Sequence, residues 1–568
     1  GTEDVAAVPP STVVRNRLTR ALGTTILALV VSIAWVVVDT LAQLATTEKM
    51  MPISGWSMVA LGLLLPLLHK VAVSLISAAP RAPGTPAAAS AYPSIIVGGL
   101  AFVLAALLLF YLDFLAHAAF GVSFTVGIWA VVTALVGSVV VGRAFALLNL
   151  SSLQQSYSQK LVRTFLGATA ADRVHPTGTD VPVPVDIPSA GDDVAFSAYH
   201  PEQNGGPLHL VNVCVNDTVD RVSGRQLQKD KGLPMCVGPA GLSVGLRYHA
   251  RWDTSEPPPT GNAVPIIPLA IDPDPNRFHL LARKDDEPVV VEQLKLGQWM
   301  AISGASFTTG AGRNTKLSQS LLLGLLNVRL GYWWNSGIDA DQRPGRYPPN
   351  LWRWLKGVPA RLFRVQASLL NEWRAYFAGP AARLWYLSDG GHFDNTGLYE
   401  LIRRRLPFII AVDGAHDDRY EFEDLAILTR QVRLDFRAEL AWIDPTAARA
   451  TGVHGWPPLD GTPPLPPVPG WIRQFFNPGA IGALSDLKRE STHCAALARV
   501  TYADDADKVT WLLLLKANLA PAMPTDVRNY ATTHPAFPNQ STLNQFFDDD
   551  QWESYRNLGQ AAGRTVFQ

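Results

Sequence analysis

Hydrophobic residues dominate the first 150 positions of the chain, where they form four long and nearly uninterrupted stretches. Each stretch reaches the roughly 20 residues that an α-helix needs to cross about 30 Å of hydrocarbon. Because the core of a soluble protein rarely holds four such stretches so close together, we expect transmembrane helices. The stretches are Ala21–Thr46, Trp56–Ala79, Ser94–Phe120 and Val122–Leu150.

Polar residues refine the prediction of about four spans. The second stretch carries His69 and Lys70 at its centre, and a central lysine costs about 3 kcal/mol in lipid. This span is therefore either re-entrant or faces other helices with its polar pair. Asp113 and His117 lie near the end of the third stretch, where pairing between helices explains them better than a transport path. Arginines flank the outer ends of the helical region, so the positive-inside rule places both ends in the cytoplasm.

After Leu150 the pattern changes to short apolar runs that alternate with amphipathic segments. An exit helix is expected over Ser151–Arg173, followed by a proline-rich linker. The strand-like runs and helical segments beyond it predict an α/β layered domain. We therefore divide the chain into an N-terminal cytoplasmic segment (1–20), transmembrane helices (21–150), an exit helix with its linker (151–195) and an α/β domain (196–568) with a proline-rich insertion near 456–471. Predicted strands are Leu208–Val215, Gln298–Ile302, Phe408–Val412 and Lys508–Lys516, and predicted helices are Leu317–Leu326, Leu398–Arg405 and Phe422–Phe436.

Charge and cysteine usage narrow the possible partners. The formal net charge is zero, which argues against a nucleic-acid partner. Three widely spaced cysteines provide neither a disulfide framework nor zinc-ligand spacing and fit a reducing compartment. The acidic loop around Asp413, His416 and Asp417 lacks the spacing of a calcium loop. The sequence therefore predicts no metal site and no cofactor.

One segment combines an acid with the local geometry that catalysis requires. Asp389 follows an apolar run and is followed by Gly390 and Gly391, and a helix is expected from about Gly397. Two glycines permit a tight turn with positive φ and let another group approach the carboxylate closely. Asn395 or Thr396 is expected to cap the helix. A carboxylate at such a position suits a general base, although a DGG tripeptide alone is also a common turn.

The surroundings of this turn make the pattern more specific. DGGHFDNTGLYELIRRR followed by FIIAVDGAHDD resembles the patatin-like phospholipase family, in particular its large bacterial membrane-associated members. The segments AISGASFTTGAG, NVRLGYWW and FPNQSTLNQFFDDDQWESYRNLG are similar to further segments of that family, in the same order. The resemblance implies a patatin-like α/β fold and a Ser–Asp dyad without a catalytic histidine. It assigns the general base to Asp389, with Gly390 and Gly391 shaping its turn.

The chain departs from the family pattern at the nucleophile. The family's glycine-rich GGGxR loop and its GxSxG elbow precede the aspartate, and no GGGxR occurs here. We expect a segment upstream of Gly1 to supply both. Two serines within the chain remain weaker candidates. Ser243 lies in a literal GLSVG but lacks the strand-to-helix context of an elbow, and Ser303 is placed at the end of a predicted strand. His392, beside the DGG, is a weaker candidate for a triad histidine.

Together these features predict a membrane-associated lipid acyl hydrolase of the phospholipase or lysophospholipase type. Its substrate would be a membrane lipid ester, and its location the bacterial inner membrane with the α/β domain in the cytoplasm. The alternative is a non-catalytic, membrane-anchored scaffold or sensor whose hydrolase-like domain has lost activity. The sequence immediately upstream of Gly1 separates the two hypotheses, because only the enzyme requires a nucleophile there.

Overall fold

The computed structural model covers the 568-residue chain, and some segments of it are not described below. The description is limited to residues 10–46, 91–167, 189, 191–219, 227, 231–246, 248–252, 263–271, 278–280, 289–292, 294–337, 362–444, 474–477, 479–520, 523–541 and 547–567. The second predicted span and the proline-rich insertion near 456–471 lie outside the described residues.

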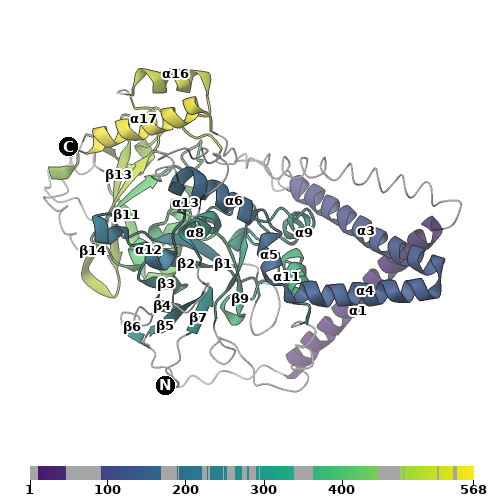
Figure 1. Cartoon of the computed structure of the whole chain (residues 1–568). Helices are drawn as coiled ribbons and strands as arrows, with labels where there is room; N and C mark the ends of the chain where they lie inside the picture. Colours follow the sequence, from purple (N-terminus) through teal and green to yellow (C-terminus); the bar gives the residue numbers. More distant parts are fainter. Residues whose placement is uncertain are drawn as a thin grey trace, which may run out of the picture.

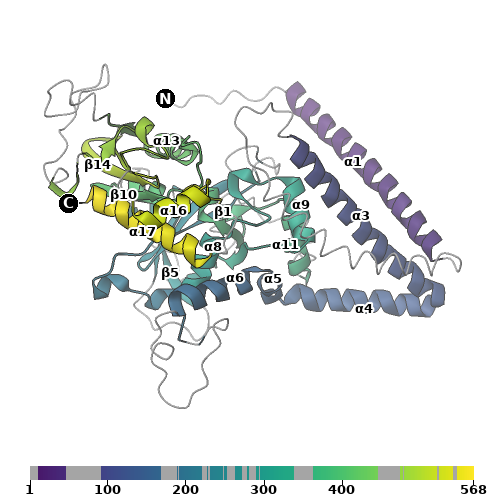
Figure 2. The same cartoon turned by 90° about the horizontal axis from the view of Figure 1, so that it is seen from above.

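Three long helices extend away from an α/β body (Figure 1). They are α1 (Pro10–Ala45), α3 (Ala91–Val122) and α4 (Phe124–Arg143). Ser123 separates α3 from α4 and caps α4 by accepting a hydrogen bond from the amide of Val126. α1 contacts α3 and crosses it at a steep angle (Figure 1), while α4 returns from the far end of α3 to the body (Figure 2). Two windows, Val97–Val122 and Phe124–Arg143, are long and apolar enough to cross a membrane.

These helices are not core helices of a soluble domain. Only 11% of the apolar window in α3 and 6% of that in α4 is buried, whereas a soluble core helix would be mostly covered. Large apolar side chains lie on the surface, with Phe102, Phe124 and Trp129 each at least 65% exposed. Soluble monomeric proteins rarely expose an apolar surface of this extent.

The first part of the α/β body is a nine-stranded sheet in the order β6-β5-β4-β3-β2-β1-β9-β8, with β7 paired to β5. All of its pairings are antiparallel. One face packs against helix α8 (Leu296–Ser303) through a core that includes Trp299 and Trp334. The strands are β1 (Val211–Asn216), β2 (Gly232–Gly238), β3 (Gly241–Val244), β4 (Tyr248–Trp252), β5 (Ala263–Ile271), β6 (Phe278–Leu280), β7 (Val289–Glu292), β8 (Tyr332–Asn335) and β9 (Leu384–Asp389).

The second part is a five-stranded sheet in the order β10-β14-β13-β11, with β12 paired to β13. β10 runs parallel to β14, and its buried apolar residues pack against helices α12 and α13 in a separate core. The strands are β10 (Phe408–Asp413), β11 (Ala438–Trp442), β12 (Ile481–Gly482), β13 (Ala495–Tyr502) and β14 (Asp505–Lys516). The remaining helices of the body are α9 (Leu317–Leu325), α11 (Arg364–Trp373), α12 (Leu398–Arg403), α13 (Glu423–Phe436), α16 (Thr525–Thr533) and α17 (Asp549–Val566).

Most predicted elements are present, with two corrections. The predicted strand Gln298–Ile302 is wrong, because these residues lie in helix α8. The exit helix predicted over Ser151–Arg173 is shorter among the described residues: α5 (Ala146–Leu150) precedes it, and α6 (Gln154–Leu161) continues into a π-turn at Val162–Leu166. Both errors concern packed segments, α8 against β1 and α6 against α8, where tertiary contacts override a short local pattern.

The long helices are attached to the body at specific contacts. Gly98 in α3 lies against Ser318 of α9, where an added Cβ would come within 3.6 Å of the serine Cβ. Gly142 in α4 is more tightly packed, since a Cβ there would lie 2.3 Å from the carbonyl oxygen of Leu362. Gln366 of α11 also donates to the carbonyl of Ser138 at 2.8 Å. These contacts fix α3 and α4 relative to the α/β body.

Candidate functional site

Asp389 is the last residue of β9 and begins the turn that sequence analysis singled out. β9 pairs with the central strand β1, and Val213 lies directly opposite Asp389. The carboxylate accepts a hydrogen bond from the amide of Gly391 at 2.7 Å. Within the described residues this is the only hydrogen bond that the Asp389 side chain makes. The second carboxylate oxygen is therefore available to another proton donor.

Gly390 and Gly391 are required by close contacts and not by an unusual backbone angle. Neither residue has a positive φ, so that part of the prediction is wrong. A Cβ on Gly390 would lie 2.5 Å from the carbonyl oxygen of Asn212. A Cβ on Gly391 would lie 2.6 Å from Oδ1 of Asn395 and 3.1 Å from Oδ1 of Asp389. The glycines thus let the turn, a 3-10 turn at Gly390–His392, fold closely around the carboxylate.

Burial raises the pKa of Asp389 from its usual 3.8 to about 6, and the hydrogen bond from Gly391 opposes this shift. A base titrating near this value is ionised at neutral pH and still binds a proton well, which is the condition for efficient general-base catalysis. Tyr157 of α6 lies nearby, because the pKa of its hydroxyl is raised by burial and by the charge of Asp389. The local pattern of α6 contains no signal that could have identified Tyr157 beforehand.

Ser303 lies at the end of α8, close to the DGG turn. Its hydroxyl donates to the carbonyl oxygen of Asn212 at 2.8 Å, the same atom that limits the space at Gly390. The expectation that Ser303 follows a strand is wrong, since it is the last residue of a helix. A nucleophile elbow places its serine between a strand and the start of a helix. Ser303 therefore lacks the elbow geometry and binds a backbone carbonyl.

Ser243 lies in the interior of β3 and is separated from Asp389 by the width of the sheet. Strands β2 and β1 intervene between β3 and β9, so three strand spacings, about 14 Å, separate the two residues. The Ser243 hydroxyl contacts Nδ1 of His249 at 2.9 Å and accepts from Arg403 at 3.0 Å. Burial lowers the pKa of His249 to about 4, so this imidazole is neutral at pH 7. The structure does not bring Ser243 to Asp389.

The contacts of His392 give it a structural role beside Asp389. Its Nδ1 lies 3.0 Å from the hydroxyl of Ser388, and a hydrogen bond with the backbone of Ser306 acts on the same ring. Burial lowers the pKa of His392 to about 4. Both contacts tie the ring to residues other than Asp389. The triad interpretation of His392 therefore gains no support from the geometry.

Asp394 and Thr396 carry out the capping that was expected from Asn395 or Thr396. Oδ2 of Asp394 accepts from the amide of Tyr399 at 2.9 Å, and the Thr396 hydroxyl accepts from the amide of Leu398 at 3.2 Å. Asn395 instead donates to Asp424 at 2.7 Å. Burial raises the pKa of Asp394, but its hydrogen bonds are all used at the start of α12. Asp394 is therefore a helix cap and not a second base.

The acidic loop after β10 is neutralised by a buried lysine. Nζ of Lys516 donates to Asp413 at 3.0 Å and lies 3.9 Å from Asp417. The lysine is 2% exposed, so its ammonium group takes the position between the carboxylates that a cation would need. This contact ties the ends of β10 and β14 together, as their parallel pairing of Asp413 with Lys516 requires.

A small cavity adjoins the DGG turn at Gly390. It has a volume of about 10 Å³ and is lined by Asn212, Gly390, Phe393 and Asp394, among others. This space holds about one water molecule and is too small for an acyl chain. Asp389 is not among its lining residues.

Comparison with known proteins adds no further constraint. No protein-family model, no curated protein and no solved structure matches the chain. Its function therefore has to be inferred from the residues themselves.

Proposed function

We propose that the chain is the membrane-anchored part of a patatin-like lipid acyl hydrolase in which Asp389 is the general base of a Ser–Asp dyad. The observation that carries this proposal is the state of the Asp389 carboxylate. It is half-buried and held at one oxygen by the amide of Gly391, and desolvation raises its pKa to about 6. The other oxygen accepts no hydrogen bond among the described residues. A carboxylate that only needed to stabilise the turn would use both oxygens, as Asp394 does.

The nucleophile in this proposal is a serine outside residues 1–568. Ser303 and Ser243 both have their hydroxyl groups engaged elsewhere, with Asn212 and with His249 and Arg403 respectively. The incoming serine hydroxyl donates its proton to the free oxygen of Asp389 as it attacks the carbonyl carbon of the ester. The base then returns the proton to the departing alcohol, which leaves an acyl-enzyme that water hydrolyses.

We further propose that α3 and α4 cross the bacterial inner membrane and hold the α/β domain at its cytoplasmic surface. Two features support this: the lengths of the apolar windows and the exposure of their side chains. The arginines near the start of α1 (Arg15, Arg17 and Arg20) and the basic residues after α4 support a cytoplasmic position for these ends. A lipid ester substrate is concentrated at that surface, so membrane attachment brings the site to its substrate.

The topology is tested by cysteine labelling in intact cells. Val122, at the junction of α3 and α4, is 74% exposed, and Asp418 is an exposed residue of the α/β domain. We expect Val122→Cys to react with a membrane-impermeant maleimide from outside, and Asp418→Cys to react only after lysis. The three native cysteines are buried and give a low background. Labelling of both positions from the same side would contradict the proposed topology.

The catalytic proposal is tested on the natural protein that contains this chain, in detergent or nanodiscs. Phospholipid and p-nitrophenyl ester hydrolysis is measured for the wild type, for Asp389→Asn and for Asp418→Asn, a control that removes an exposed carboxylate. Loss of the base is expected to lower kcat by at least about 10²-fold in Asp389→Asn alone. Undiminished turnover in this variant would remove Asp389 from the mechanism.

A fluorophosphonate probe identifies the nucleophile independently, because it forms a covalent bond with an activated serine. Mass spectrometry is expected to find the adduct on a serine outside residues 1–568. An adduct on Ser303 or Ser243 would overturn the assignment of the nucleophile. No adduct together with no ester hydrolysis would favour the alternative, a membrane-anchored scaffold or sensor without catalytic activity.

A further inference from the structure

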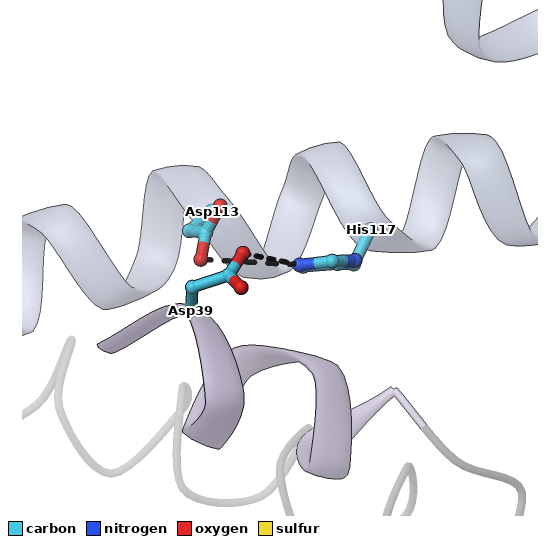
Figure 3. A group of neighbouring side chains, drawn as sticks. All are labelled: Asp39, Asp113 and His117. Atoms are coloured by element: carbon cyan, nitrogen blue, oxygen red, sulfur yellow. Dashed lines mark hydrogen bonds and ion pairs between the residues drawn. The ribbon is translucent and has the colours of Figure 1, made fainter. Parts of the chain in front are cut away.

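Two aspartates and a histidine meet between the apolar helices α1 and α3, far from Asp389. Nε2 of His117 lies 3.0 Å from Oδ1 of Asp39 and 4.0 Å from Oδ2 of Asp113. One ligand atom from each of the three residues lies within 4.8 Å of the other two. Figure 3 shows the three side chains pointing toward one another from the two helices. Sequence analysis expected Asp113 and His117 to pair between helices, but it could not identify their partner Asp39, which is 78 residues away from His117.

The state of Asp113 indicates that the cluster lacks a ligand. The Asp113 side chain is only 10% exposed, and its Oδ2 accepts no hydrogen bond although it is buried. A buried carboxylate oxygen without a partner costs free energy unless a proton or a cation is bound to it. This oxygen points into the space between Asp39 and His117 (Figure 3).

The charges of Asp39 and Asp113 favour the binding of a cation. Among the described residues, His117 is the only ion-pair partner of either aspartate. Metal ligands bind in their deprotonated form, so two carboxylates and one imidazole would together supply a charge of −2, which one divalent cation balances. The surrounding surface is apolar, with Leu41 and Leu112 more than half exposed on the same helices. In such a setting a bound cation is held more strongly than in water.

We propose that Asp39, Asp113 and His117 bind a divalent transition-metal cation of the zinc type, which links α1 to α3. Imidazole and carboxylate are ligands that Zn²⁺ accepts at about 2.0–2.2 Å, and three protein ligands with one open position are typical of zinc sites that keep a water molecule. These bond lengths separate tetrahedral ligand atoms by about 3.4 Å. The ligand atoms lie within 4.8 Å of one another, so the cluster reaches this geometry if Asp113 moves inward by at most about 1.4 Å, which a side-chain rotation provides.

The position of the cluster sets the side from which the cation enters. His117 precedes the end of α3 at Val122 by five residues, which corresponds to about 8 Å along the helix. That end joins α4 at the tip farthest from the α/β body (Figure 1). The cation therefore binds near the membrane surface opposite the candidate hydrolase site, and its effect is to fix the packing of α1 on α3.

The first experiment measures Co²⁺ binding to the full chain in nanodiscs, using Co²⁺ as a spectroscopic substitute for Zn²⁺. We expect one saturable site with the intense visible bands of four-coordinate Co²⁺, displaced by Zn²⁺. Removing a residue that only hydrogen-bonds to a metal ligand already weakens metal binding by about 10–100-fold. Loss of a direct ligand in Asp113→Asn or His117→Gln is therefore expected to weaken binding by more than about 100-fold. Unchanged affinity in both variants, or no saturable binding to the wild type, would overturn the proposal.

A matched control removes a histidine–carboxylate contact elsewhere. Nδ1 of His200 lies 3.0 Å from Glu202 in the α/β body, so His200→Gln removes a similar surface pair. This variant is expected to retain the Co²⁺ site of the wild type. Equal loss of binding in His200→Gln and His117→Gln would assign the metal to non-specific surface contacts and refute the site.

A third variant remains informative even if other substitutions disturb folding. His117→Cys replaces the imidazole with a thiol, which is also a zinc ligand. If position 117 contacts the metal, Co²⁺ binding to this variant produces a thiolate-to-cobalt charge-transfer band in the near ultraviolet, which the wild type lacks. Co²⁺ binding without this band would show that the residue at 117 is not a ligand and would contradict the proposal.

Discussion

The α/β body contains a buried carboxylate, Glu372, and a half-buried one, Asp389, whose surroundings differ sharply. Glu372 of α11 accepts hydrogen bonds from Arg329 at 2.8 Å, from Trp333 at 2.7 Å and from Thr309 at 2.9 Å. Asp389 accepts one hydrogen bond, from Gly391. Burial raises the pKa of both, but the charge of Arg329 opposes the shift only at Glu372. One carboxylate is therefore fully paired, and the other is left partly unpaired.

The difference separates a structural role from a functional one. A fully paired buried carboxylate holds elements together, because removing any partner leaves an uncompensated charge. Arg329 extends this role to the segment that follows α4, since it also donates to Ser151, which comes directly after α5. A partly paired carboxylate costs stability and remains able to accept a proton. Such a group is retained where its chemistry is used, as is common at active sites.

The largest expected effect on stability comes from removing Glu372, which leaves Arg329 without its ion-pair partner. Glu372→Ala leaves the Arg329 guanidinium buried without its partner, and removing one side of such a pair typically costs about 3–5 kcal/mol. We expect a loss of this size in the free energy of unfolding, measured by chemical denaturation of the full chain in detergent.

A double-mutant cycle checks the cause of that loss. Because Arg329→Met removes the unpaired charge, the variant carrying both Arg329→Met and Glu372→Ala is expected to be less destabilised than the sum of the single changes. Additive losses would show that the two side chains do not act as a pair.

Sequence patterns predicted the Asp389 turn but not the Glu372 centre. The turn is local, so an acid, two glycines and a following helix could be recognised within a few residues. The Glu372 centre is assembled from Thr309, Arg329, Trp333 and Glu372, which come together only when β8, α11 and the loop after α8 are packed. The predicted strand at Gln298–Ile302 failed for a related reason: a run of four apolar residues after Gln298 fits a strand and a buried helix equally well.

The second prediction concerns the stability cost at Asp389. An acid whose pKa is higher in the folded chain binds its proton more tightly when folded, so stability falls as the pH rises from about 4 to about 6 and the cost is complete above that window. The rise from 3.8 to about 6 corresponds to at most about 3 kcal/mol. Asp389→Asn is therefore expected to stabilise the chain at pH 8 by up to this amount, and by less at pH 4.

The pH dependence shows whether the stabilisation of Asp389→Asn comes from the raised pKa of Asp389 or from better packing of the new side chain. Thermal unfolding at pH 4 and pH 8 is compared for Asp389→Asn and for the exposed control Asp418→Asn. A stabilisation of Asp389→Asn that is the same at both pH values would contradict the raised pKa. Loss of stability at pH 8 would show that Asp389 is a structural residue like Glu372.

The third prediction tests why the turn needs glycine. In Gly390→Ala the new Cβ meets a backbone carbonyl, that of Asn212, which cannot move without distorting the sheet. Such overpacking typically costs about 1–3 kcal/mol. In Gly391→Ala the closest atom belongs to the exposed side chain of Asn395, which can rotate away. We expect a smaller loss there, and no steric loss in Gly414→Ala, where no atom lies within 4 Å of the new Cβ.

The smallest effect on stability is expected at an exposed arginine–glutamate pair, in contrast to the buried pair of Arg329 and Glu372. Arg433 binds Glu439 through two hydrogen bonds, at 2.6 and 2.8 Å, and this pairing lowers the pKa of Glu439. Both side chains are more than half exposed, so water replaces either partner at little cost. Arg433→Gln is expected to leave the unfolding temperature within experimental error at physiological salt. If this change were as costly as Glu372→Ala, burial would not be what distinguishes the two pairs, and the contrast between Glu372 and Asp389 would need a different physical cause.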